Sequence, residues 1–82
     1  MTEQEFNKLK FREVAHITSD DRYSAFYECV SEILADRLKV VAWYNRDKQT
    51  GKPLDEKPLI HYSLDGKLYR NREAILEIIK SI

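Results

Sequence analysis

The clearest pattern of apolar and polar positions lies between Ser19 and Leu38. Apolar side chains recur there at spacings of three and four residues, which is the period of one face of an α-helix. Ser19 can cap such a helix, and Asp20 and Asp21 suit the positive end of its dipole. The pattern predicts a long amphipathic helix, whose apolar stripe is Tyr23, Phe26, Tyr27, Val30, Ile33, Leu34 and Leu38.

The next segment, residues 39–46, is rich in β-branched and aromatic residues, a composition typical of a strand. Val41 and Tyr44 would also continue the preceding apolar stripe, so the pattern alone does not decide at which residue the long helix ends. Residues 46–58 contain one glycine and two prolines, which indicate a turn and a loop. That loop favours a strand over residues 39–46.

Asp65-Gly66 separates two short runs, residues 59–64 and 67–70. Asp-Gly readily adopts the positive φ angles of a tight hairpin turn, so the sequence predicts an antiparallel Asp-Gly hairpin. Asn71 can then cap a C-terminal helix. We expect this helix to pack on the sheet through Ile75, Ile78, Ile79 and Ile82.

The first eighteen residues carry two weaker signals. Thr2 and Glu5 have the spacing of a capping box, which predicts a short helix from about residue 3. Residues 9–18 alternate between apolar and polar positions, with Glu13 and Val14 as exceptions. This alternation favours a strand, and a continued helix is the alternative.

Together these elements predict an α+β fold, with a small antiparallel sheet covered by helices. Eighty-two residues form a single domain, 1–82. No apolar run approaches the roughly 20 residues that span a bilayer. The N-terminus lacks the basic start and apolar run of a secretory signal, and one cysteine cannot form an internal disulfide. We therefore expect a cytoplasmic protein that does not enter a membrane.

The residue types that carry catalysis are poorly placed. His16 and His61 have no Cys or His partner at the spacing of a zinc site. A catalytic Cys29 would need an activating base nearby in space, and His16 or His61 could supply one, but nothing in the sequence places either beside it. The only glycines are Gly51 and Gly66, which excludes a glycine-rich phosphate loop. We expect no catalytic residue, no metal site and no cofactor, and therefore no enzyme.

Aromatic and basic residues gather in the predicted sheet and hairpin. Tyr, Trp and Arg dominate the binding energy of protein interfaces, whereas aromatics beside cations can also stack on bases and hold phosphates. The same residues could simply pack the sheet against the helices. The candidate binding residues are Trp43, Tyr44, Tyr62, Lys67, Tyr69, Arg70 and Arg72.

The charge distribution bears on the partner. The chain has no net charge, but residues 1–38 carry five basic and eight acidic groups, and residues 39–82 carry nine basic and six acidic. This is far from the strongly basic signature of a nucleic-acid binder. The leading hypothesis is a small regulatory protein that docks on a protein partner, and the width of the apolar stripes also allows a homodimer.

The alternative is a nucleic-acid-binding regulator that uses the basic hairpin. A helix, three antiparallel strands and a final helix resemble the order of double-stranded-RNA-binding domains, and a hairpin beside helices resembles small winged-helix regulators. Double-stranded-RNA-binding domains have a lysine-rich start at their last helix, whereas this chain has only Arg70 and Arg72 there. Winged-helix regulators need a basic recognition helix, whereas the predicted long helix of this chain is acidic. Both resemblances are therefore at the level of the fold alone.

Overall fold

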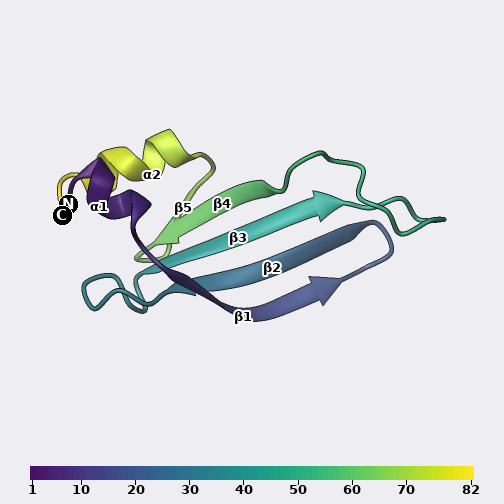
Figure 1. The fold of residues 1–82 in the computed structure, drawn as a ribbon, viewed down its shortest axis with the longest axis horizontal. Helices are drawn as coiled ribbons and strands as arrows, with labels where there is room; N and C mark the ends of the chain where they lie inside the picture. The colour runs from purple at the N-terminus through teal and green to yellow at the C-terminus, as the bar shows by residue number, and fades with distance from the viewer.

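Five antiparallel strands form an open sheet in the computed structural model, which describes residues 1–82 (Figure 1). Each strand pairs with its neighbour in sequence, so the order across the sheet is β1-β2-β3-β4-β5. The two helices and the two chain ends lie together at one end of an elongated molecule of 45 × 22 × 21 Å. The elements are α1 (Glu3–Asn7), β1 (Phe11–Thr18), β2 (Arg22–Cys29), β3 (Leu38–Asn45), β4 (Leu59–Leu64), β5 (Lys67–Tyr69) and α2 (Arg72–Ile79).

The predicted long amphipathic helix is wrong. Its first half is strand β2, which pairs with β1 on one side and with β3 on the other. Its second half, residues 30–37, is a loop of turns that ends beside Asp36, whose φ is +64°. Tyr23 and Tyr27 are four residues apart, but Tyr23, Ala25 and Tyr27 also satisfy the two-residue period of a strand. Aromatic content and two pairing partners favour the strand.

The N-terminal elements follow their local signals. The Thr2 side chain accepts a hydrogen bond from the Glu5 amide at 3.1 Å, and the Glu5 carboxylate accepts one from the Thr2 amide at 3.1 Å. This capping box starts α1. The alternating segment becomes β1, with a bulge between Glu13 and Ala15. The bulge accounts for the break in alternation at Glu13 and Val14.

The C-terminal part contains two pairs of strands and a capped helix. The strand expected over 39–46 is β3. Strands β4 and β5 pair with Leu64 opposite Lys67, and the two residues between them have φ of +51° at Asp65 and +85° at Gly66. The Asn71 side chain accepts a hydrogen bond from the Ala74 amide at 2.8 Å and so caps α2. Helix α2 packs against β4, β5 and α1.

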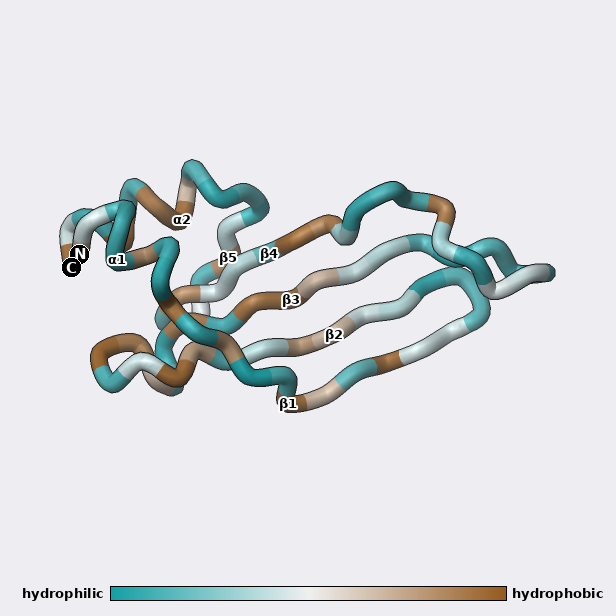
Figure 2. The backbone as a smooth tube through the Cα atoms, in the orientation of Figure 1, coloured by the Kyte–Doolittle hydropathy of each residue, from teal (hydrophilic) through white to brown (hydrophobic).

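The closed core lies only at the helical end. Nine of the 82 residues are buried, eight of them in this core and the ninth, Ala25, in the middle of the sheet opposite Ala42. Figure 2 shows hydrophobic segments in α2 and in the loop between β2 and β3 at the helical end. The helices therefore cover one end of one sheet face, and the rest of the sheet has no second layer. The core residues are Phe6, Cys29, Leu34, Leu38, Leu64, Ile75, Leu76 and Ile79.

Candidate interaction surface

All five tyrosines of the chain lie on one face of the sheet. Residues directly opposite each other in antiparallel strands point to the same side, so the strand register assigns each side chain to a face. Leu38 and Leu64 are opposite each other and belong to the core beneath the helices. We call the uncovered part of this side the tyrosine face. Its residues are Phe11, Tyr23, Tyr27, Val40, Ala42, Tyr44, Ile60, Tyr62 and Tyr69, with Glu13, His16 and Lys67 near its edges.

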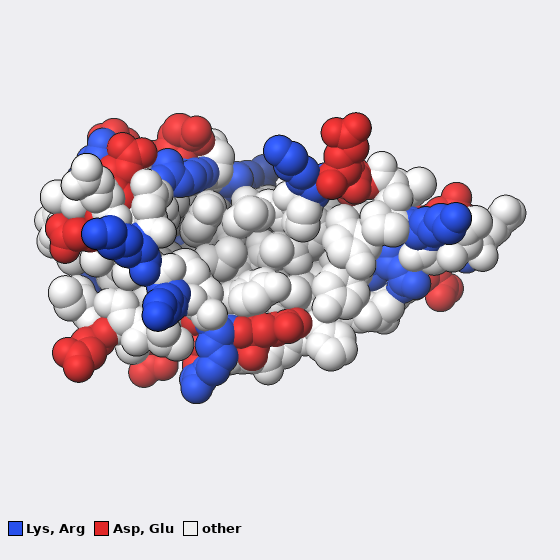
Figure 3. Space-filling view, in the orientation of Figure 1, with Lys and Arg blue, Asp and Glu red and all other residues white.

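The middle of the tyrosine face is a shallow apolar hollow. The small side chain of Ala42 lies between larger ones, and the hollow of about 350 Å³ is lined by Phe11, Tyr27, Val40, Ala42, Ile60 and Tyr62. The space-filling view shows an uncharged hollow over the middle of the sheet, with charged side chains around it (Figure 3). A surface of this kind can receive an apolar or aromatic side chain from a partner.

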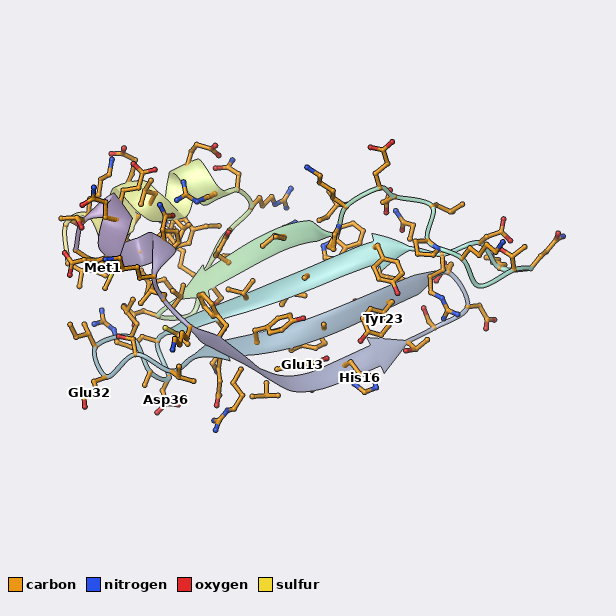
Figure 4. The ribbon with its side chains drawn as sticks, in the orientation of Figure 1. Met1, Glu13, His16, Tyr23, Glu32 and Asp36 are labelled. Carbon is orange, nitrogen blue, oxygen red and sulfur yellow. The ribbon has the colours of Figure 1, made fainter.

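Aromatic rings are ordered at the end of the face that is far from the helices. The ring centroids of Tyr23 and Tyr44 are 5.2 Å apart, and those of His16 and Tyr23 are 6.0 Å apart, both in stacked arrangements. Figure 4 shows His16 and Glu13 along β1 and Tyr23 on β2. Because the three rings support one another, they are partly fixed before any partner binds, which lowers the entropy cost of binding.

The charges on the tyrosine face lie near its edges. Glu13 is on β1 at one edge of the sheet, and Lys67 is on β5 at the other. Lys67 Nζ is 5.5 Å from the centroid of the Tyr69 ring. Partial removal from water by neighbouring groups raises the pKa of the Tyr23 hydroxyl, and the Glu13 carboxylate raises this pKa further. Tyr23 therefore stays a neutral donor and acceptor at physiological pH.

The opposite side of the sheet, which we call the tryptophan face, carries more positive charge. The Arg22 guanidinium carbon lies 4.3 Å from the centroid of the Trp43 ring, and His61 meets this ring edge-on at 5.9 Å. Arg12 pairs with Glu28. The residues of this face include Arg12, Arg22, Ser24, Phe26, Glu28, Lys39, Val41, Trp43, Leu59, His61 and Ser63.

The structure divides the candidate binding residues among three places. Tyr44, Tyr62, Tyr69 and Lys67 belong to the tyrosine face, whereas Trp43 points to the other side. Tyr62 is partly covered, because its ring lies 6.4 Å from that of Phe6 in α1.

The two arginines that follow β5 have different surroundings. Arg70 is exposed and lines a surface depression beside β4 together with Pro58 and Ile60. Arg72 is used inside the fold, where its guanidinium contacts Glu3 at 3.4 Å, hydrogen bonds to Asn7 and lies 5.4 Å from the Phe6 ring. Lys67, Arg70 and Arg72 therefore do not act as three equivalent free cations.

The sequence prediction missed several residues of the tyrosine face. The pattern of apolar positions predicts that Tyr23 and Tyr27 belong to the apolar stripe of a helix, and it does not single out Phe11, Ala42 or Ile60 as binding residues. The Tyr-x-Ala-x-Tyr-x-Cys alternation over residues 23–29 was the available signal. It places Tyr23 and Tyr27 on the same side of a strand as buried Cys29.

The sheet ends in two edges of different character. All eight residues of β1 are exposed, and its bulge at Val14 interrupts the row of backbone groups that could pair with another strand. Such bulges protect edges from strand addition. Strand β5 covers β4 only from Tyr62 to Leu64. The faces, rather than the edges, therefore offer the larger continuous surface.

Cys29 is 3% exposed within the core, and His, Cys, Asp and Glu side chains do not gather into a set of three that could hold a metal ion. Neither helix is long and apolar enough to cross a membrane. Comparisons with protein-family models, curated proteins and solved structures find no match to this chain.

Proposed function

We propose that this chain is a small, non-enzymatic regulatory protein that acts by docking on a protein partner through the tyrosine face. One observation carries the proposal. The accessible surface is 6025 Å² for a mass of 9.8 kDa, whereas a folded monomer of this mass exposes about 5,200 Å². This excess, about 850 Å² over the whole elongated molecule, is comparable in size to the roughly 800 Å² that each partner buries in a standard protein interface.

The composition of the tyrosine face supports a protein partner. Tyrosine supplies a large apolar ring and a hydroxyl with only two rotatable bonds, so it loses little entropy on binding. An apolar centre with charges near the edge matches the arrangement of protein interfaces. Phe11 and Ile60 are 37% and 42% exposed, and burying them would add to the hydrophobic driving force.

Two variants on neighbouring positions of β3 test the proposal. Ala42→Arg places a charge in the centre of the tyrosine face, and Val41→Arg places the same charge on the tryptophan face. We expect tagged protein to capture a defined partner from nuclease-treated lysate of its native host, and we expect only Ala42→Arg to lose it. Recovery that survives Ala42→Arg, or that is lost only with Val41→Arg, contradicts docking through this face.

A second candidate function, nucleic-acid binding, rests on the tryptophan face instead of the hairpin. Arg22 stacked on Trp43 is an arrangement that can hold a base and its phosphate, and Lys39 lies on the same side. Fluorescence titration with single-stranded oligonucleotides tests it. Two phosphate contacts predict a salt slope of about −1.4, and Trp43→Ala should cost about 1–3 kcal/mol of affinity. If no binding is detected at about 100 µM, the weak end of the usual range of non-specific affinity, this candidate is removed.

A further inference from the structure

We infer that the occupant of the tyrosine face is a second copy of this chain, packed face to face in a two-fold dimer with the two helical ends at opposite ends of the assembly. The inference rests on the proposed docking function, because it uses the same surface. It adds the identity of the partner and the geometry of the complex. Four observations carry it, from area, charge, shape and side-chain size.

The area fits one copy. The surface exposed beyond that of a folded monomer of 9.8 kDa is about 850 Å², and a two-fold interface of standard size takes roughly 800 Å² from each copy. The eight-residue core at the helical end is small for a chain of 82 residues. A second sheet would give the uncovered half of the molecule the apolar layer that it lacks.

The charge of the face suits self-association. Glu13 and Lys67 balance each other, and Figure 3 shows that the middle of the sheet is uncharged. A face with strong charge of one sign would repel its own copy. The tryptophan face is different, since Arg12, Arg22 and Lys39 outnumber Glu28 there. Two copies can therefore meet through the tyrosine face with much less electrostatic cost.

The shape of the molecule selects the orientation. Helices α1 and α2 lie over one end of the sheet only (Figure 1). Two copies with their helices at the same end would collide, because sheets packed face to face are about 10 Å apart, which is also the diameter of a helix. With the helices at opposite ends, the far end of each sheet fits against the helices of the other copy. The strands of the two sheets then cross at about 30°, as in aligned sheet packing.

The smallest side chains mark the centre of contact. Ala25 is opposite Ala42, and these alanines separate the Tyr23–Tyr44 pair from the Tyr27–Val40 pair. A two-fold axis near Ala42 brings Tyr23 of one copy over Tyr27 of the other. Tyr44 then enters the hollow beside Val40 of the second copy. Large rings would thus fill the space above small residues, as core packing requires.

Sedimentation velocity of the purified chain tests the dimer. We expect the parent protein to sediment as a dimer at about 10–100 µM, well above a micromolar dissociation constant. Ala42→Arg should be monomeric, because the two-fold axis brings two like charges together in an apolar site. Val41→Arg should remain a dimer. A parent that is monomeric throughout this range, or a dimer that only Val41→Arg disrupts, overturns the inference.

Circular dichroism shows whether the Ala42→Arg variant is a folded monomer or is simply unfolded. At about 0.1 µM, well below a micromolar dissociation constant, the parent is mostly monomeric, and parent and variant should show the same folded spectrum. If the variant is unfolded there, Tyr44→Lys replaces it, since Tyr44 is partly exposed at the far end of the face. A dimer that survives Tyr44→Lys also overturns the inference. If the parent is monomeric but captures a different protein, and Ala42→Arg loses that protein, the dimer is ruled out and the proposed docking function is retained.

Spin labels test the orientation. Gln49→Cys in a Cys29→Ala background places one label in the loop opposite the helical end of a molecule 45 Å long. In the inferred dimer the two labels lie at opposite ends, so their separation should be of the order of this length. Each should approach the helical end of the other copy. Two labels close together would show the helices at the same end and would contradict the proposed geometry.

Discussion

Replacing Leu38 by alanine should remove a large part of the stability of the fold, whereas Val40→Ala should cost little in the monomer. Both residues lie on the same face of β3, two positions apart. Leu38 is 0% exposed beneath the helical end, and Val40 lies in the uncovered part of the sheet. The pair therefore tests whether the closed core is confined to that end.

The magnitudes follow from burial. A Leu→Ala change in a closed core costs about 3–5 kcal/mol, because a cavity adds to the lost transfer free energy. A chain of 82 residues has a total stability of about 4–12 kcal/mol. Val40→Ala removes two methyl groups that are already partly in water, so about 1 kcal/mol is the upper bound. At about 4–8 °C per kcal/mol, Leu38→Ala should lower the melting temperature by at least about 12 °C.

Urea unfolding followed by circular dichroism measures both changes. The measurement should be made at about 0.1 µM and again at about 100 µM, because a dimer with a micromolar dissociation constant adds stability only at the higher concentration. Leu38→Ala should be costly at both concentrations, whereas Val40→Ala should become more costly at the higher one. An equal loss of unfolding free energy in the two variants at the low concentration would contradict a core that is confined to the helical end. That result would mean that the uncovered part of the sheet is as well packed as the helical end.

Three further predictions concern single contacts. Gly66→Val should cost more than about 1 kcal/mol in thermal unfolding, because the φ of Gly66 is +85°, which a β-branched residue adopts only with strain. Steric contact does not contribute, since no atom lies within 4 Å of an added Cβ. An unchanged melting temperature would contradict the role of backbone strain. The bidentate Arg37 contact lowers the pKa of the Asp65 carboxyl. The ion pair should therefore stabilise the fold fully at pH values above the ordinary Asp pKa of about 3.9, and this effect should be lost as the pH falls through the lowered pKa. In that acid range, the unfolding free energy of Asp65→Asn should depend less steeply on pH than that of the parent. If the two proteins show the same dependence on pH, the prediction is wrong. Asn71→Ala should cost about 1 kcal/mol by loss of the α2 cap, whereas Asn71→Asp should retain most of it, as measured by urea unfolding.

The features that sequence analysis predicted well depend on neighbouring residues. The Thr2–Glu5 capping box and the Asn71 cap each involve residues three positions apart, so the local sequence determines them. The segment from Tyr23 to Cys29 differs, because its apolar residues satisfy both the helical and the strand period. Only the pairing partners, β1 and β3, decide between the two, and a strand's partners are not visible in its own sequence.

The candidate binding residues show the same limit. Tyr44 and Trp43 are adjacent, and their separation onto two faces follows from the strand period once the strand is known. The use of Arg72 within the fold depends on α1, since Glu3 and Asn7 lie more than sixty positions earlier in the chain. An ion pair between the two ends of a chain requires the tertiary structure. Arg72 therefore could not be distinguished from a free cation beforehand.

The position of the core has a consequence for the order in which the protein folds. Every strand pairs with its neighbour in sequence, so the sheet can form step by step with small loop-closure costs. The core is different, because Phe6 must meet Ile75, Leu76 and Ile79 from the other end of the chain. During synthesis the hairpins can form early, but the hydrophobic cluster cannot close until residue 79 is free of the ribosome. Until then the sheet exposes both of its faces, and this interval is when the chain is most open to aggregation.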